Sequence, residues 1–439
     1  MKTLLISFVS LITLVWGYDV FYLHPLQGAL PWLIQKQGLY LSGLWAIALM
    51  SLVMVLSIRP AWLEKPLGGM DKMYRLHKWA GILGISAASL HWLIDMSSDL
   101  LKSWIGTSGR PPKGDLSEFA IMFRSFAKDS GELIIYALLV MLVLTLWKKF
   151  PYRLWRYVHK VMPVFFLFLV FHVIVLAPAN YWTQPVGILL VALFVPACIA
   201  SIISLMGMIG KPRQSNGIIE SIRGHNTDIT EITCKMESSW KTHHAGQFAF
   251  LTFDQLEGAH PFTISSAPDD DRRISFQIKA LGDYTRQLSR QINVGQKIKA
   301  EGPYGCFDLS HLDIKSHHTM IAGGIGITPF LSWLEYCQKS SATIPATDLH
   351  YCLRNADNDP FINRIRQFCE ALPSVSLHVH QSEKGEYFTA EKLAQTLQQK
   401  DRTSIWYCGP TSLADSLKSN LKKWWHGKFT FHQEAFEMR

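Results

Sequence analysis

Two stretches of this chain begin and end with histidine and are mostly apolar in between: His77–His91, HKWAGILGISAASLH, and His159–His172, HKVMPVFFLFLVFH. The two histidines stand 14 residues apart in the first stretch and 13 apart in the second. On an α-helix either spacing corresponds to roughly 20 Å, which is most of a membrane's hydrocarbon thickness of about 30 Å. Two such helices side by side would therefore offer two facing histidine pairs, one near each membrane surface.

The chemistry of facing imidazoles favours a metal-binding role for all four histidines. Ionisable side chains at membrane depth are costly and usually mark function, and a six-coordinate haem iron takes one imidazole from each side. A single histidine here could be a structural residue at the membrane surface, but two matched pairs predict that His77 with His159, and His91 with His172, bind two haems. Thirteen residues do not return a straight helix to the same face, so Pro163 is predicted to kink or rewind that helix.

Hydropathy divides the 439 residues into an apolar first half and a second half of ordinary globular composition; overall, 49 % of residues are hydrophobic and 18 % charged. The first and fourth apolar segments are short for membrane spans, so flanking residues must contribute to them. The start of the chain resembles a signal peptide without a small-residue cleavage site, which predicts a retained first span. The six predicted spans cover residues 3–17, 39–58, 78–94, 133–147, 161–177 and 184–208.

Basic residues indicate the orientation of this membrane domain. They gather in the connections after the second, fourth and sixth segments, whereas 18–38 holds one lysine and 178–183 no charge. Both termini, together with His77 and His159, are therefore predicted on the cytoplasmic side of a bacterial-type inner or plasma membrane. The connection 95–132 carries both signs of charge and is expected to be a long outer loop. This pattern accounts for most of the net charge of +9. The second half has no basic stripe with interleaved aromatics, so binding to nucleic acid is not indicated.

The seven cysteines lie on the sixth apolar segment or in the second half, and none lies in a predicted outer loop. They form no CxxC pair, so neither an iron–sulfur cluster nor a zinc site is indicated. Their placement fits thiols in a reducing cytosol.

The second half begins, after a polar linker at 211–217, with strand-like runs at 217–222, 227–236 and 248–253, which predict a small antiparallel barrel. The sequence HPFTISSAP follows at 260–268. An aromatic such as Phe262 can cover a flavin ring, and hydroxyl groups such as those of Thr263 and Ser266 can bond to its heteroatoms. The same composition also fits a barrel strand that ends in a serine-rich turn.

The sequence KALGDYT at 279–285 precedes a predicted helix. Gly282 permits close backbone approach, Thr285 can cap the helix start, and free amides at such a start hold phosphate, with Lys279 adding positive charge. An ordinary strand–turn–helix would give the same pattern.

An apolar strand at 319–322 runs into a turn that contains Gly323, Gly324 and Gly326 and ends at Thr328 and Pro329. The glycines let backbone N–H groups approach a pyrophosphate, and a cap followed by proline fits a helix start, although a glycine-rich turn alone is a weak signal. Apolar runs at 348–353, 375–380 and 404–408 then alternate with helical stretches, which predicts an α/β domain with a parallel sheet.

Ligands of such sheets bind at the carboxyl ends of the strands, where Arg354 and the sequence Cys408-Gly409-Pro410 would lie. Arg354 could meet a 2′-phosphate, which favours NADPH over NADH; a solvated loop arginine is the alternative.

With these motifs the chain resembles the ferric reductase / NADPH oxidase superfamily along nearly its whole length. In that family two membrane helices each carry two haem-ligating histidines, and the four histidines above fall on those positions. The second half is similar to a ferredoxin–NADP reductase-type module. The resemblance implies a six-helix transmembrane di-haem bundle at 1–210, an antiparallel β-barrel FAD-binding domain at 216–312 and an α/β NAD(P)-binding domain at 316–439.

The resemblance also implies roles for single residues. Phe262 would lie on the flavin ring and Thr263 near its reactive nitrogen. The stretch 432–436 would place Glu434 near the hydride path and Phe436 over the flavin, although three residues follow Phe436 where several relatives end. The residues expected to be catalytic are Thr263, Cys408, Glu434 and Phe436. Those expected to contact FAD or the nucleotide are His260, Pro261, Phe262, Thr263, Ser266, Lys279, Gly282, Thr285, Gly323, Gly324, Gly326, Thr328, Pro329, Arg354, Cys408, Gly409, Pro410 and Phe436.

What the resemblance implies for function is a transmembrane oxidoreductase that passes electrons from cytosolic NADPH, with NADH as the alternative, via FAD and two b-type haems to an outer acceptor. Oxygen is the expected acceptor, which would make the chain a superoxide-producing oxidase. A ferric-chelate or metal reductase with the same path is the alternative, and a non-enzymatic haem-binding scaffold or sensor is the third. Membrane lipid and the small-molecule acceptor are the expected partners; nucleic acid, calcium control through an EF-hand and a further protein partner are not indicated.

Overall fold

The computed structural model describes residues 1–23, 28–111, 118–147, 149–224, 228–254, 257–308, 312, 316–340, 344–398, 400 and 402–434. The chain divides into two compact units. One is built from Met1–Leu63 and Lys72–Ile209, and the other from Glu64–Asp71 and from the described residues between Gly210 and Glu434.

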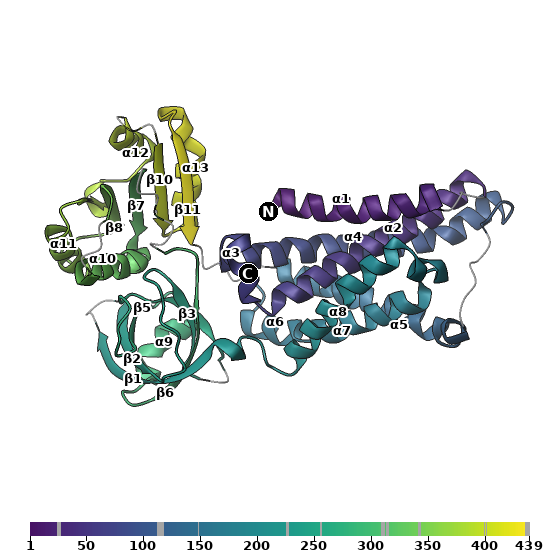
Figure 1. The fold of residues 1–439 in the computed structure, drawn as a ribbon, viewed down its shortest axis with the longest axis horizontal. Coiled ribbons are helices and arrows are strands. Elements are labelled where there is room, and N and C mark those ends of the chain that lie inside the picture. The colour runs from purple at the N-terminus through teal and green to yellow at the C-terminus, as the bar shows by residue number, and fades with distance from the viewer. Residues whose placement is uncertain are drawn as a thin grey trace. The chain divides into compact units, whose positions relative to one another are not determined.

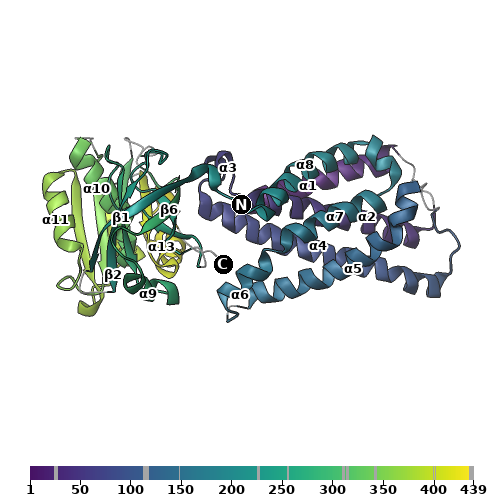
Figure 2. The ribbon, with the colours of Figure 1, turned by 90° about the horizontal axis from the view of Figure 1, so that it is seen from below.

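The first unit is helical, and its long helices lie side by side along one direction (Figures 1 and 2). Helix α5 packs on α7, α7 on α8, and α8 on α2. Large apolar side chains such as Leu14 and Ile188 are exposed around this bundle, which suits a lipid environment. The elements are α1 (Lys2–Tyr18), η1 (Asp19–Leu23), α2 (Leu30–Ser57), α3 (Ala61–Leu67, which extends into the second unit), α4 (Met70–Ile105), α5 (Glu118–Leu146), α6 (Tyr152–His159), α7 (Met162–Leu176), η2 (Ala179–Thr183) and α8 (Pro185–Leu205).

Within the described part of the chain, five helical stretches are long and apolar enough to cross a membrane. They are Lys2–Leu23, Leu30–Ser57, Ile121–Leu146, Leu154–Leu176 and Pro185–Leu205. Helix α4 has 36 residues but is not one of the five; charged residues such as Lys78 and Asp95 flank its apolar middle. The first and fourth predicted spans do extend into their flanks, as their short apolar segments required.

The expectation of a long outer loop at 95–132 was wrong. Helix α4 continues to Ile105 and α5 begins at Glu118, so most of this region is helical. Lys128 of α5 pairs with Asp95 of α4 at 3.5 Å. Much of the mixture of charges that resembled a loop therefore lies on two helices.

The helical segment around Pro163 is broken rather than kinked. Helix α6 ends at His159 and α7 begins at Met162, with Pro163 in the first turn of α7, where its missing N–H costs nothing. Because the chain restarts its helix between His159 and His172, the two histidines need not obey the phase of one continuous helix.

The second unit contains an antiparallel six-stranded sheet with the strand order β4-β3-β6-β1-β2-β5. A bridge between Ile264, just after β4, and Phe276 of β5 links its two edge strands. Buried residues such as Ile232, Ala249 and Phe276 form its core. The elements are β1 (Gln214–Gly224), β2 (Ile229–Met236), β3 (Phe248–Thr252), β4 (His260–Thr263), β5 (Arg273–Lys279), α9 (Asp283–Gln291) and β6 (Lys297–Tyr304).

A parallel five-stranded sheet follows, in the order β11-β10-β7-β8-β9, as the alternating pattern predicted. Helices α10 and α11 pack in the core on one face, and α12 and α13 in the core on the other (Figure 1). The strand order reverses between β7 and β10, which is where such sheets bind ligands. The elements are β7 (His317–Gly323), α10 (Thr328–Ser340), β8 (Thr347–Leu353), α11 (Ile362–Ala371), β9 (Val375–Gln381), α12 (Ala390–Leu397), β10 (Arg402–Cys408), α13 (Thr411–Trp424) and β11 (Lys428–Glu434).

The core around α10 joins the two sheets of the second unit, because it includes Ala245 and Phe307 from the part of the chain that carries the antiparallel sheet. The indole of Trp333 on α10 donates a hydrogen bond to the Ala245 carbonyl at 2.9 Å and stacks on Phe307. Gly246 makes this approach feasible, since a Cβ there would lie 2.2 Å from the indole nitrogen. The flavin-type and nucleotide-type motifs are therefore carried on one packed body.

Candidate functional site

The four histidines form two facing pairs inside the helical unit. The ring centroids of His77 on α4 and His159 on α6 lie 6.2 Å apart, with the ring planes at 62°. Those of His91 on α4 and His172 on α7 lie 6.4 Å apart, at 77°. The structure thus brings together the residues that the sequence pattern paired.

Both separations suit a metal ion between the rings. A metal–nitrogen bond is about 2 Å long and a ring centroid lies about 1.2 Å beyond its nitrogen, so an iron held from both sides separates the centroids by about 6.4 Å. Two imidazoles that bonded to each other directly would lie closer.

Backbone carbonyls orient three of the four rings. The Nδ1–H groups of His77 and His91 donate to the carbonyl oxygens of Val53 and Leu39, both on α2, at 3.1 and 2.8 Å. On the other side, His172 donates to Ala127 of α5 at 2.7 Å. Because a carbonyl only accepts, each bond fixes the tautomer and leaves Nε2 as a metal ligand, the arrangement typical of ligating histidines.

Glycines give two of these rings their space. A Cβ at Gly131 of α5 would lie 2.4 Å from Nδ1 of His172, and one at Gly43 of α2 would lie 3.0 Å from Nδ1 of His91. A side chain at Gly131 would therefore displace the His172 ring.

His159 differs from the other three histidines. Its buried Nδ1 has no hydrogen-bond partner, and its ring stacks on Trp155 with centroids 4.8 Å apart. Aromatic packing, and not a carbonyl, orients this ring.

The predicted flavin motif forms β4 and the turn after it. Thr263 is buried and pairs with Phe248 of β3, while Phe262 pairs with Ala249. The ring of His260 stacks on Tyr284 of α9, with centroids 4.3 Å apart and planes at 15°. Pro261 belongs to the same short strand, so His260, Phe262 and Thr263 lie on neighbouring positions of one edge strand.

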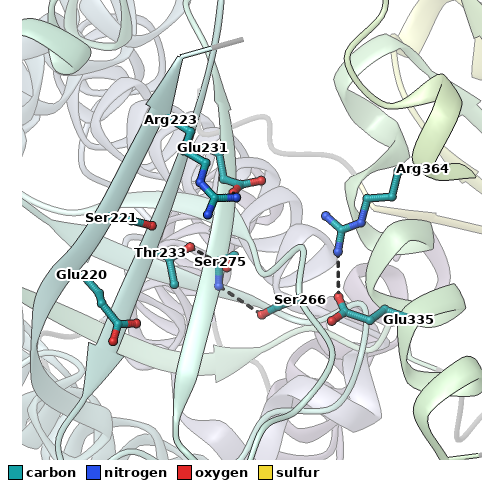
Figure 3. A pocket seen from close by; sticks show the side chains of 9 residues that line it. All are labelled: Glu220, Ser221, Arg223, Glu231, Thr233, Ser266, Ser275, Glu335 and Arg364. Carbon is teal, nitrogen blue, oxygen red and sulfur yellow. Dashed lines mark hydrogen bonds and ion pairs between the residues drawn. The ribbon is translucent and has the colours of Figure 1, made fainter.

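Ser266 is fixed by protein groups. Its hydroxyl accepts the Ser275 N–H at 3.0 Å, and its carbonyl accepts the Ser332 hydroxyl at 2.6 Å. Figure 3 shows Ser266 at the wall of a cavity of about 560 Å³. Glu335 and Arg364 of that wall pair with each other at 3.0 Å. The hydroxyl of Ser266 thus bonds to β5, and its expected contact with the cofactor stays a prediction.

The predicted phosphate turn is a helix start, and Thr285 caps it as the sequence predicted. Gly282 is the N-cap of α9, and Thr285, three residues on, accepts the Gly282 and Leu281 N–H groups at 3.0 Å. Lys279 pairs with Asp228 at 3.6 Å. The lysine charge is therefore partly neutralised by this neighbour.

Two turns meet at the carboxyl ends of β7 and β10. After Gly323, the chain makes a short 3₁₀ turn, η5 (Gly324–Ile327), before Thr328 and Pro329 begin α10. A Cβ at Gly323 would lie 2.6 Å from Pro410, and one at Gly326 would lie 2.2 Å from the Cys408 carbonyl oxygen. Glycine at these positions lets the two turns touch at the reversal point of the sheet.

Gly409 completes this contact. A Cβ on Gly409 would lie 3.0 Å from the backbone of Gly323, so each turn requires the other to be narrow. Gly324 adopts a φ of +54°, a left-handed conformation that glycine takes without strain. The nucleotide motif and the Cys408-Gly409-Pro410 motif thus form one surface.

Cys408 and Glu434 lie opposite each other at the ends of β10 and β11. Burial raises the pKa of Glu434 well above its usual range, and the negative charges of Asp71 and Glu64 act in the same direction. Its Oε2 atom is buried without a hydrogen-bond partner. Burial, with a smaller effect from Glu434, raises the pKa of the Cys408 thiol. In both groups burial therefore favours the neutral, protonated form.

Arg354 directly follows β8 and its side chain is 88 % exposed. Its Nε lies 3.2 Å from a carboxylate oxygen of Glu383 in η6 (Ser382–Lys384), the turn after β9. The arginine is where the sequence placed it, with a carboxylate beside it that sequence reasoning did not consider.

Phe436, predicted to cover the flavin, lies outside the described residues. Sequence reasoning also missed several groups that shape the candidate site. The carbonyls that orient the histidines carry no sequence signal. Gly131 did carry one, because a lone glycine in an apolar helix often marks close packing. Tyr284 stood inside the predicted phosphate turn, but its contact with His260 depends on the tertiary fold.

Three family models match consecutive parts of the chain. They describe a ferric reductase like transmembrane component at residues 42–170, an FAD-binding domain at 216–313 and an oxidoreductase NAD-binding domain at 320–419. The chain therefore carries the domains of an NAD(P)H-dependent oxidoreductase of the membrane-bound type. This domain order matches that of the ferric reductase / NADPH oxidase superfamily, which confirms the resemblance noted in the sequence.

Curated relatives agree with this placement. The chain is 31 % identical over 152 residues to the carnitine monooxygenase reductase subunit of Escherichia coli (35 % of this chain, 44 % of that protein). It is 27 % identical over 232 residues to a superoxide-generating NADPH oxidase heavy chain of Dictyostelium discoideum (47 % and 42 %) and 29 % identical over 130 residues to NADPH oxidase 1 of Mus musculus (28 % and 21 %). The chain thus spans less than half the length of each of these relatives.

Proposed function

We propose that this protein is a transmembrane NAD(P)H oxidoreductase that passes electrons from a cytosolic nicotinamide nucleotide, through FAD and two b-type haems, to an acceptor on the other side of the membrane. The observation that carries this proposal is the two imidazole pairs, 6.2 and 6.4 Å apart, in a chain that also holds an FAD-binding and an NAD-binding domain. FAD accepts a hydride and releases single electrons, which haem iron carries, so these groups supply the redox chemistry.

The residues of the helical unit fit this role. His77 with His159, and His91 with His172, would each hold one iron through Nε2. The carbonyl bonds on three of the rings keep those nitrogens pointed at the metal and raise their basicity. Gly131 and Gly43 make space for two of the rings.

The residues of the second unit would bind and orient FAD and the nucleotide. Phe262 and Thr263 would face the flavin, and the amides at the start of α10 would hold the nucleotide pyrophosphate. Glu434 is a buried acid beside Cys408, its pKa is raised by burial, and it would hold a proton near the site of hydride transfer. The bridge from Ile264 to Phe276 supports closure of the flavin-domain sheet into a barrel.

Helix α4 would be the sixth membrane span, because it carries His77 and His91, each facing a histidine of α6 or α7. The basic connections favour both termini and the FAD/NAD(P) module on the cytoplasmic side of an inner or plasma membrane, with membrane lipid and a small acceptor as the partners. The His77 site would then be the inner one and the His91 site the outer.

Oxygen is the acceptor that we favour, because three matching relatives are named as NADPH oxidases, two of them as superoxide-generating. The test is cytochrome c reduction by the purified full-length protein with NADPH and FAD, with and without superoxide dismutase. Dismutase-sensitive reduction is expected. Ferric-chelate reduction that dismutase does not inhibit would instead favour a metal reductase, a function that the ferric reductase family model supports.

A ligand variant tests the haem assignment separately. His172→Leu should remove one haem and block transmembrane transfer, while NADPH still reduces the flavin. If the variant keeps its full haem content, the assignment of His172 is wrong.

A further inference from the structure

The ion pair between Arg354 and Glu383 lies at the carboxyl ends of β8 and β9, beside the nucleotide turn. Arg354 follows β8, and β8 is the neighbour of β7, whose turn faces the start of α10. A dinucleotide with its pyrophosphate at that helix start places the ribose of its adenosine half over the next strand end. Arg354 and Glu383 therefore lie where the ribose 2′ position is recognised.

The carboxylate of Glu383 is held in place by its neighbours. Its Oε1 pairs with Nε of Arg354 at 3.2 Å, and its Oε2 accepts the side-chain N–H of Asn355 at 2.9 Å. Its backbone N–H donates to the Arg354 carbonyl at 3.1 Å. These contacts join the turns after β8 and β9 and keep the carboxylate beside the guanidinium.

The two possible electron donors, NADPH and NADH, require different protein groups at the ribose 2′ position. A 2′-phosphate carries close to two negative charges at pH 7 and is best bound by an unpaired guanidinium. A free 2′-hydroxyl is neutral and can donate a hydrogen bond to a carboxylate, as in NAD-binding sites of this sheet type. Arg354 offers the first kind of contact, and Glu383 offers the second.

We propose that Glu383 is a specificity-determining residue: it occupies the Arg354 guanidinium and repels a 2′-phosphate, so that the chain accepts NADH as well as NADPH. This inference rests on the proposed function, since it assigns the choice of electron donor. An exposed ion pair is weak enough to exchange partners when a nucleotide binds. The pair thus lowers the preference for NADPH without abolishing binding of that nucleotide.

The test is a calorimetric titration of the full-length protein with 2′,5′-ADP and with 5′-ADP, which differ only in the 2′-phosphate. Removing one negative charge about 6 Å from a dianion in a water-like dielectric should tighten binding by about tenfold. We expect Glu383→Gln to bind 2′,5′-ADP about tenfold more tightly and 5′-ADP within about twofold of the wild type. Arg354→Ala should weaken the binding of 2′,5′-ADP and leave the binding of 5′-ADP unchanged.

Two controls locate the effect. Glu386→Gln removes a nearby carboxylate that accepts the Gln381 N–H and is not paired with Arg354. This variant should leave the ratio of the affinities for 2′,5′-ADP and 5′-ADP unchanged. Lys384→Ala removes the cation next to Glu383 in the sequence. If Lys384→Ala, and not Arg354→Ala, abolishes the preference for 2′,5′-ADP, or if Glu383→Gln leaves the ratio within about twofold, the proposal is overturned.

Oxidation of NADH and NADPH by the same variants separates this proposal from the proposed function. If Glu383→Gln raises the ratio of kcat/KM for NADPH to kcat/KM for NADH by about tenfold, both the specificity proposal and the proposed function are supported. If the ADP titrations shift as expected but neither dinucleotide is oxidised, the specificity site stands and the proposed reaction fails.

Discussion

Gly131→Ala tests whether the His172 ring is held at the position a metal requires. The new methyl carbon would lie 2.4 Å from Nδ1 and 2.6 Å from Cε1 of His172, whereas ordinary contacts begin at 3.4 Å. The clash is with a ring that also donates to Ala127 at 2.7 Å, so the ring must move by about 1 Å and lose that bond.

The magnitude follows from the length of the metal bond. A displacement of about 1 Å is half of a metal–nitrogen bond of about 2 Å, so His172 can no longer ligate with normal geometry. Loss of an orienting contact alone weakens metal binding by about 10–100-fold. We therefore expect Gly131→Ala to lose the haem of the His91/His172 site and to keep the other.

The assay is the haem content per chain of the purified full-length protein, measured as the pyridine haemochrome, with the low-spin optical spectrum as a second readout. Gly81→Ala in α4 is the matched control, because its Cβ would meet only Val53, at 3.9 Å. Gly43→Ala, at 3.0 Å from Nδ1 of His91, should give an intermediate effect. Unchanged haem content and spectrum in Gly131→Ala would refute the reasoning.

Three further predictions concern the second unit. Glu434→Gln places an uncharged side chain of the same shape at this buried position, so thermal stability should persist. Reduction of the flavin by NADPH, measured by stopped flow, should slow by about 10²-fold. An unchanged rate would exclude proton transfer by Glu434. Gly326→Ala should weaken 2′,5′-ADP binding by at least about tenfold in a titration, because its Cβ would lie 2.2 Å from a backbone oxygen; equal affinity would contradict the packing described. Burial lowers the pKa of His350 to about 3. Below pH 6.5 the unfolded chain therefore binds a proton at this histidine more readily than the folded chain does, and the stability of the fold declines as the pH falls towards 3. The loss should reach about 2 kcal/mol at pH 5, and thermal unfolding of His350→Phe should show less acid sensitivity than the wild type.

The neighbours of His350 bear on that pH dependence. Its Nδ1 lies 3.1 Å from Nε2 of His380, and its ring stacks on His378. Asp348 bonds to both His317 and His378. Glu386 and Lys392, from the α12 side, act on His380. Because His378 and His380 also repel a charge on His350, single histidine variants should not be additive.

Periodicity and motif spacing predicted the two-part architecture, the parallel sheet and the histidine pairing. These features depend on patterns that run along the chain: apolar stretches of membrane length, alternation of strands and helices, and histidines at matched intervals. The glycines at 323, 326 and 409 were found for the same reason, since a narrow turn leaves a local mark in the sequence.

Contacts between distant residues could not be predicted in this way. Lys279 was expected at a phosphate, but Asp228 lies beside it across the strand ends. The pairing of Glu383 with Arg354 depends on the adjacency of β8 and β9, and the carbonyl of Ala127 faces His172 only because α5 packs on α7. The helical ends of the predicted loop 95–132 were missed because charged residues on two facing helices look, in sequence, like a polar loop.

The unequal bonding of the four imidazoles has a consequence for reduction potentials. An imidazole whose Nδ1–H donates to a carbonyl is the more basic ligand and stabilises ferric iron, which lowers the potential. Both rings donate at the His91/His172 site, but only His77 does so at the other. Two haems bound there would titrate in separate steps, with the His91/His172 haem at the lower potential. In the proposed orientation, a voltage negative inside would then help drive electrons to that site, with about 2.3 kcal/mol per 100 mV for a full crossing.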